Sequence, residues 1–274
     1  MKLLNFRYFL IVLLFVVYQK SEAKTVLSDH SKKVSTDSIH NENEALFYRV
    51  GENQLLELIY NEIFGEHIGS TVLWLNIFSD EALSSFSNSD YMVLENNSSG
   101  GFEIYDEKNN FVVIAPDLQD YYSLETGKGK WVKSRTNGFN KTYFTNDKGK
   151  EYTMTFKFSL GGKKTIKDEN GYEINLNGKI NGNYDITDNE GRKIQIKVDR
   201  SGVYRLIEGE HELKKMVAQS IQSFNIIDRK GNQLNIRKRG RFNDLILSFP
   251  DGREVFIRNR FKKLLPTTKE EIKN

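Results

Sequence analysis

The chain has 274 residues, a formal net charge of +3 and no cysteine. A chain without cysteine forms no disulfide, carries no lipid-modified cysteine and performs no thiol chemistry. Its stability must therefore come from a hydrophobic core, which a chain of this length can supply. Because secreted eukaryotic domains commonly use disulfides, the composition favours a bacterial envelope or secreted protein.

The first 23 residues have the layout of a secretory signal peptide. Two basic residues precede an apolar run over 9–18, and the small residues Ser21 and Ala23 stand just before a possible cleavage point. The apolar run is about half as long as the roughly 20 residues that a membrane-spanning helix needs. The sequence therefore predicts a cleaved signal over 1–23 and a secreted or periplasmic protein with no transmembrane span after cleavage.

Charge is distributed unevenly along the chain. Residues 41–125 contain sixteen acidic side chains and two basic ones, whereas residues 126–274 contain thirty-two basic and eighteen acidic ones. The two parts therefore carry opposite net charges of the same size, about −14 and +14. This division indicates two regions that attract each other, two solvated faces of one fold, or a basic surface for an anionic partner.

A polar leader and a small acidic α+β region follow the predicted signal. Residues 24–43 lack aromatic side chains and a sustained period, which is typical of a flexible segment. Apolar side chains at helical spacing predict an amphipathic helix from Glu44, which Gly51 divides into two pieces. The α+β region over 44–125 continues with predicted strands at 71–78, 91–94, 101–107 and 110–115.

Regularly spaced glycines characterise the basic part over 126–265, which a polar tail follows at 266–274. These glycines recur at intervals of 18 to 22 residues, at Gly149, Gly171, Gly191, Gly209, Gly231 and Gly252. A short strand follows most of them and a second strand returns towards the next, so each unit of about twenty residues predicts one β-hairpin. Apolar and polar residues alternate within the strands, as over 152–160, which favours an antiparallel meander with one apolar face.

The predicted fold class is therefore mainly β: an antiparallel meander of hairpin repeats that can curl into a partial barrel, preceded by the small α+β region. One segment departs from the pattern, because residues 210–221 have the composition of a short helix with Leu213, Met216 and Val217 facing inward. A transmembrane barrel also alternates apolar and polar residues. The short strands and the charged, nonaromatic C-terminal end argue against that alternative.

No catalytic or metal motif is supported by its surroundings in the sequence. The acidic turns place Asp or Asn ahead of a glycine, as tight turns require, and they lack the bidentate Glu of a calcium loop. His211 and Glu212 open like a zinc-protease helix, but Lys215 stands where the second histidine belongs. We therefore expect no metal and no cofactor.

One loop combines acidic and aromatic residues and is the best sequence candidate for contacting a sugar or a cation. The same composition suits an aromatic anchor between the two halves of the chain. The loop residues are Asp117, Asp120, Tyr121, Tyr122 and Glu125, near Trp131.

The densest basic tract lies towards the C-terminus, on both sides of a predicted hairpin. Guanidinium groups on neighbouring strands can bind phosphate or sulfate through bidentate contacts, although a solvated sheet face has the same composition. The predicted anion-binding residues are Arg237, Lys238, Arg239, Arg241, Arg258 and Arg260.

These observations lead to the hypothesis of an exported, noncatalytic protein. Its basic sheet face would bind an anionic glycan or lipid headgroup, or assemble with other envelope or secreted proteins. Two alternatives stay open: a secreted glycan-acting hydrolase that uses carboxylates of the acidic region, and a secreted toxin or effector. No catalytic residue is predicted, and no nucleic-acid partner is expected of an exported chain without a recognised binding module.

Overall fold

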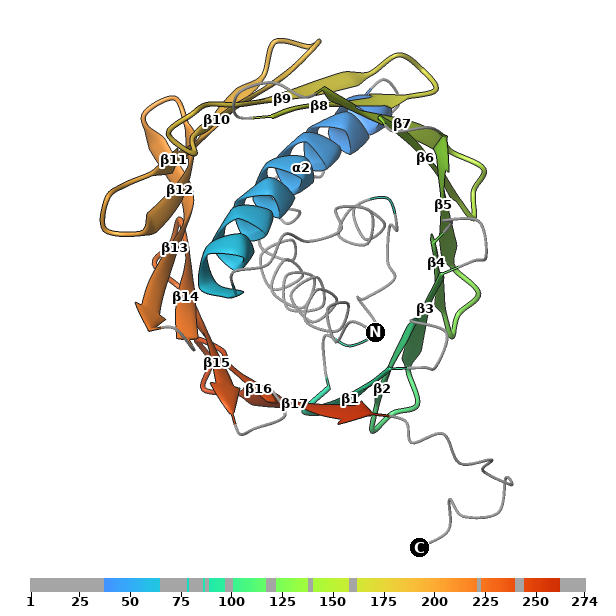
Figure 1. Cartoon of the computed structure of the whole chain (residues 1–274), viewed down its shortest axis with the longest axis vertical. Coiled ribbons are helices and arrows are strands. Elements are labelled where there is room, and N and C mark those ends of the chain that lie inside the picture. Colours follow the sequence, from blue (N-terminus) through green and yellow to red (C-terminus); the bar gives the residue numbers. More distant parts are fainter. Residues whose placement is uncertain are drawn as a thin grey trace, which may run out of the picture.

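A closed barrel of antiparallel strands encloses a long helix (Figure 1). Among the residues that the structure describes, seventeen strands form one sheet in which each strand pairs antiparallel with the next along the chain. The ring closes where the first strand pairs parallel with the last, Tyr91 lying opposite Phe256. The computed structural model describes residues 37–64, 78, 86, 89–96, 101–116, 122–137, 140–157, 162–220, 223–239 and 244–261.

The described elements are one helix and the strands of the barrel. The helix is α2, Asp37–Phe64. The strands are β1 (Tyr91–Asn96), β2 (Phe102–Asp106), β3 (Phe111–Pro116), β4 (Tyr122–Thr126), β5 (Trp131–Asn137), β6 (Lys141–Asn146), β7 (Glu151–Lys157), β8 (Lys163–Asp168), β9 (Glu173–Gly178), β10 (Tyr184–Asp188), β11 (Lys193–Val198), β12 (Val203–Glu208), β13 (His211–Ser220), β14 (Ser223–Asp228), β15 (Gln233–Arg239), β16 (Asp244–Ser248) and β17 (Glu254–Phe261).

Local hydrogen bonds explain why the acidic turns form hairpins. In the β8–β9 turn, Oδ1 of Asp168 accepts hydrogen bonds from the backbone N–H groups of Asn170 at 3.0 Å and Tyr172 at 2.8 Å. Gly171 takes a φ of 87°, a left-handed conformation that costs glycine little. Asn146 and Asp188 accept the same pair of backbone bonds in their own turns. The side-chain oxygens thus serve the turn, as the sequence predicts.

Alternation along each strand sends apolar side chains into the barrel and polar ones outward. On β7, Tyr152 and Met154 are buried while Thr153 and Thr155 are partly exposed on the other face. The inward side chains and α2 share one hydrophobic cluster. A lipid-facing barrel places apolar side chains on its outer face, whereas the described strands place most of theirs inside. The predicted meander is confirmed, and its curl is complete rather than partial.

Helix α2 is continuous and lies along the inner wall, in contact with β11, β12 and β13. The prediction that Gly51 divides the helix is wrong. Gly51 instead permits a close approach to the sheet, because a Cβ at this position would lie 2.3 Å from Cδ1 of Ile194. The helix also begins at Asp37, inside the segment predicted to be a polar leader.

Residues 210–221 do not form the predicted helix. His211–Ser220 is strand β13, which pairs antiparallel with β12 and β14. Its inward side chains are Lys214 and Met216, both buried, whereas Val217 is only partly buried on the other face. Good helix formers are therefore overridden by two flanking strands that satisfy the backbone on both sides.

Strands from both predicted regions belong to the same sheet. The expected boundary at 125/126 falls within β4, and the sheet continues across it. The predicted strands at 91–94, 101–107 and 110–115 correspond to β1, β2 and β3. The signal at 1–23, the tail at 266–274 and the predicted strand at 71–78 lie outside the described residues, apart from the buried Phe78. Among the described residues, no helix is long and apolar enough to span a membrane.

Candidate functional site

Three lysines of the barrel wall point inward and bind acidic residues of α2. Nζ of Lys214 lies 2.7 Å from Glu52, and Nζ of Lys164 lies 2.6 Å from Glu57. A third pair, Lys150 and Glu42, is more exposed, at 3.5 Å. The Lys214 side chain is only 2% exposed. Because a buried ammonium group loses its hydration, it is tolerated only with such a partner.

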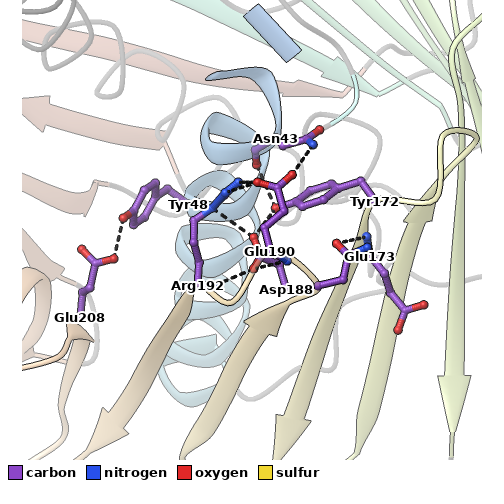
Figure 2. Close-up of polar contacts among 9 residues, drawn as sticks. Asn43, Tyr48, Tyr172, Glu173, Asp188, Glu190, Arg192 and Glu208 are labelled. Carbon is purple, nitrogen blue, oxygen red and sulfur yellow. Dashed lines mark hydrogen bonds and ion pairs between the residues drawn. The ribbon is translucent and has the colours of Figure 1, made fainter. Parts of the chain in front are cut away.

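A second inner cluster surrounds Arg192 at the rim near the start of α2 (Figure 2). Its guanidinium carbon lies 5.9 Å from the ring centroids of both Phe47 and Tyr172. Its nitrogens approach Glu190 at 2.7 Å and Asp188 at 3.1 Å. The guanidinium group is thus held by aromatic rings on α2 and on the wall, and by two carboxylates of one turn.

Two tyrosines and one asparagine complete the contact between α2 and the rim (Figure 2). Tyr48 donates to Glu208 at 2.6 Å, and the Tyr172 hydroxyl lies 3.0 Å from the carbonyl oxygen of Asn43. The Asn43 amide donates to Glu190 at 2.6 Å. Burial, and then the hydrogen bond to Glu208, raises the pKa of Tyr48. Burial also raises the pKa of Tyr172, so both hydroxyls stay protonated.

The inner clusters position α2 against the wall. The carboxylates of the Arg192 cluster, Asp188 and Glu190, already accept hydrogen bonds or ion pairs. Within the part of the chain that the structure describes, no three His, Asp or Glu side chains are grouped to hold a metal ion. The charge division in the sequence is thus explained in part by attraction between an acidic helix and basic side chains on the inner wall.

The predicted anion-binding tract, at β15 and β17, is divided between the outer and inner faces of the wall. Arg237 and Arg239 are exposed on the same face of β15, and Arg258 is exposed on β17. Lys238 is partly buried and lies on the opposite, inner face of β15, where its register partner is the core residue Leu245. Arg260 belongs to β17, but its side chain is not among those that the structure describes. Arg241 lies outside the described residues.

The register brings the three arginines to neighbouring positions. Arg239 lies opposite Asp244 on β16. On the other side of β16, Leu245 pairs with Ile257, so Asp244 lies opposite Arg258 and stands between the two arginines. Arg237 forms an exposed pair with Glu254 at 3.4 Å, which is a weak interaction in water. A hollow of about 410 Å³ is lined by Arg237, Arg239, Lys238 and Ile246. We call Arg237, Arg239 and Arg258 the arginine face.

Aromatic side chains adjoin the arginine face across the barrel seam, and sequence reasoning missed them. Tyr91 on β1 and Phe256 on β17 are register partners whose rings stack with centroids 5.8 Å apart and planes at 25°. In the next row, Arg258 pairs with Val93, which in turn pairs with Tyr105 on β2. No local pattern could find these neighbours, because the parallel pairing of the first and last strands creates them.

The acidic and aromatic loop predicted for a sugar or cation is not assembled as one site in the described residues. Tyr122 packs against the core inside the barrel, whereas Trp131 lies on the outer face, with Nζ of Lys133 4.9 Å from its ring centroid. Glu125 is exposed opposite Trp131. Asp117, Asp120 and Tyr121 lie outside the described residues.

Comparisons with known proteins identify no family for this chain. No protein-family model matches it, and no curated protein matches it. Two solved structures of the TCP10 domain of Danio rerio CPAP match with little similarity. The complex with a peptide of Danio rerio STIL is 12% identical, with a TM-score of 0.15, and the match covers 60% of this chain and 97% of that one. The domain without the peptide is 13% identical, with a TM-score of 0.17, and the match covers 59% of this chain and 96% of that one. These values are too low to indicate a shared fold or function.

Proposed function

We propose that the protein is exported and binds an anionic partner through the arginine face without catalysing a reaction. The observation that supports this most directly is the exposure of Arg237, Arg239 and Arg258 on one outer surface. Arg239 and Arg258 form no ion pair with the described residues. A guanidinium group in this position can offer its donors to sulfate, phosphate or carboxylate.

The contrast with the inner wall supports the same proposal. Lys164 and Lys214 face carboxylates of α2 at hydrogen-bond distance, so their charge is already matched within the chain. On the arginine face, Glu254 pairs with Arg237, Asp244 lies opposite Arg239, and Glu95 lies two residues beyond Val93, the register partner of Arg258. Arg239 and Arg258 form no ion pair with these three acids, so their donors can meet a partner from outside.

Charge-matched triple variants test the binding proposal. In one, Arg237, Arg239 and Arg258 become Ala; in the control, the outward lysines Lys163, Lys167 and Lys193 become Ala. Binding is measured by calorimetry to heparin, polygalacturonate, polyphosphate and phosphatidylglycerol vesicles at two salt concentrations. We expect the arginine variant to lose about tenfold or more in affinity for the preferred polyanion, since each charge-assisted bond contributes about 1.5–3 kcal/mol.

Equal losses in the two triple variants would show that only net charge matters and would overturn the proposal. So would the absence of binding to every polyanion. The export part has its own test, mass spectrometry of the mature N-terminus in fractionated cells. A mature chain that begins at Lys24 supports export, and a chain that retains residues 1–23 in the cytoplasm contradicts it.

A further inference from the structure

The outer surface beside the barrel seam combines arginines with aromatic rings in one row across the strands. Following the register, Arg237 lies beside Ile246, Ile246 beside Phe256, and Phe256 beside Tyr91. Three inter-strand spacings give this row a length of roughly 14 Å. A flexible linear ligand that crosses the strands would meet a guanidinium group at one end and two rings at the other.

The burial pattern confirms that this row faces outward. The strand neighbours of these residues, including Ile236, Val255, Ile257 and Met92, are buried inside the barrel. Ile246 is nevertheless only 7% exposed, so it forms a covered floor next to the hollow of Arg237 and Arg239. The surface is therefore a shallow platform with fixed apolar parts and charged edges.

The two rings stack on each other across the seam between β1 and β17. Tyr91 and Phe256 are stacked with their planes inclined by 25°, and both are partly buried. Side chains held in this way lose little conformational freedom when a ligand covers them. The C–H groups on one side of a sugar ring carry slight positive charge, which suits the negative face of an aromatic ring.

A second row repeats the combination two residues along the strands. Arg258, Val93, Tyr105 and Phe111 are successive register partners on β17, β1, β2 and β3. The Phe111 side chain is 40% exposed, which is unusual for a large apolar residue. The described outer residues of β8, β9 and β11 are by contrast mainly Lys, Thr, Asn and Gln. Rings and arginines are the residues that binding surfaces favour over lysine.

We propose that the seam surface binds an acidic polysaccharide, with the arginine face contacting its sulfate or carboxylate groups and Phe256 and Tyr91 stacking on its sugar rings. This inference rests on the proposed function and specifies its ligand. A membrane surface is a poorer fit because the two rings are partly buried in the sheet, whereas interfacial segments insert apolar side chains roughly 5–10 Å deep. Polyphosphate offers the charge but no sugar ring.

The decisive experiment removes the rings while keeping the arginines. Tyr91→Leu combined with Phe256→Leu retains apolar volume but abolishes stacking, and Tyr143→Leu removes a partly buried ring from the outer face of β6 as the control. Affinity of the purified proteins is measured for heparin, polygalacturonate, polyphosphate and phosphatidylglycerol vesicles, after thermal melts establish that each variant is folded.

We expect the double variant to bind heparin or polygalacturonate about tenfold more weakly, which is the combined effect of two ring contacts. Binding to polyphosphate should not change, and the Tyr143→Leu control should bind as the unaltered protein does. If only the arginine variant loses glycan binding, the ring inference is wrong and the proposed function stands. Preferential binding to vesicles also overturns the inference. If no polyanion binds, both proposals fail.

Discussion

Lys214 and Arg239 are both cations on the wall of the same barrel, yet they differ in what surrounds them. Lys214 faces inward, is 2% exposed and contacts Glu52 at 2.7 Å. Arg239 faces outward and has no ion-pair partner among the described residues. The basic excess of the second half thus consists of two populations, one that recognises the chain's own acidic helix and one that is left for another molecule. Net charge alone cannot separate them.

The largest expected effect is on the inner population. Lys214→Met should lower the free energy of unfolding by about 3–5 kcal/mol, because the largely buried Glu52 would lose the ammonium group that lies 2.7 Å away. Combining Lys214→Met with Glu52→Gln should recover most of this loss. Urea denaturation measures both, and Lys163→Met on the outer face is the control, with an expected change within about 0.5 kcal/mol. A loss below about 1 kcal/mol for Lys214→Met contradicts the inner pairing.

The fit of α2 against the wall gives a smaller, directional prediction. A Cβ on residue 51 would meet Cδ1 of Ile194, an atom that valine lacks. Gly51→Ala should therefore be more favourable in an Ile194→Val background than in the unaltered protein, by about 1 kcal/mol in a double-mutant cycle. Additive effects of the two changes would mean that α2 does not approach β11 as closely as described.

Acid should weaken the β2–β3 turn through Asp106. Burial alone would raise its pKa, but hydrogen bonds from Asn110 and Ser89 outweigh burial and hold the pKa below its ordinary value. A depressed folded-state pKa contributes stability above the unfolded pKa of about 4, and this is lost as pH falls towards the folded pKa. We expect the advantage of the unaltered protein over Asp106→Asn to be about 1 kcal/mol at pH 6 and to shrink by pH 3.

Asparagine is a fair substitute in this experiment. Asn146 occupies the corresponding position of the β6–β7 turn, where its Oδ1 accepts from the N–H groups of Lys148 and Lys150. The turn should therefore survive in the Asp106→Asn variant. Thermal melts at several pH values measure the difference, and a pH-independent gap between the two proteins would contradict the ionised state of Asp106.

The smallest effect on stability is expected on the arginine face. Replacing Arg237, Arg239 and Arg258 by Ala should change the free energy of unfolding by less than about 1 kcal/mol, because exposed ion pairs contribute little. Urea denaturation of the triple variant checks this. A large loss would mean that the arginines support the fold, and the two cationic populations would then be alike.

Local signals in the sequence were sufficient for the hairpins. Glycines with positive φ, such as Gly171 and Gly191, follow acidic turn residues, and alternation identified the inward side chains of β7 and β11. The failure at β13 has a physical cause. The segment consists largely of good helix formers, and its inward lysine, Lys214, pairs with Glu52 on α2, a residue 162 positions earlier in the chain.

The candidate site was predictable only in its charged part. Arg237, Arg239 and Arg258 stand close together in the sequence, so a hairpin reading brings them to one surface. Tyr91 and Phe256 are far apart in the chain, and their contact depends on a pairing that closes the barrel. Propensity and alternation describe neighbours along a strand or across one turn, and they contain no information about which distant strands meet.

The parallel pairing that closes the barrel follows from the odd number of its strands. In a meander, every strand reverses the direction of the one before it, so the first and last strands point the same way whenever the number of strands is odd. The described barrel has seventeen, and each hairpin contributes two. Adding or deleting a complete hairpin therefore preserves the parity, and a wider or narrower ring could close through the same pairing of β1 with β17. Changes by whole hairpins therefore preserve the relative direction of the two strands that form the seam.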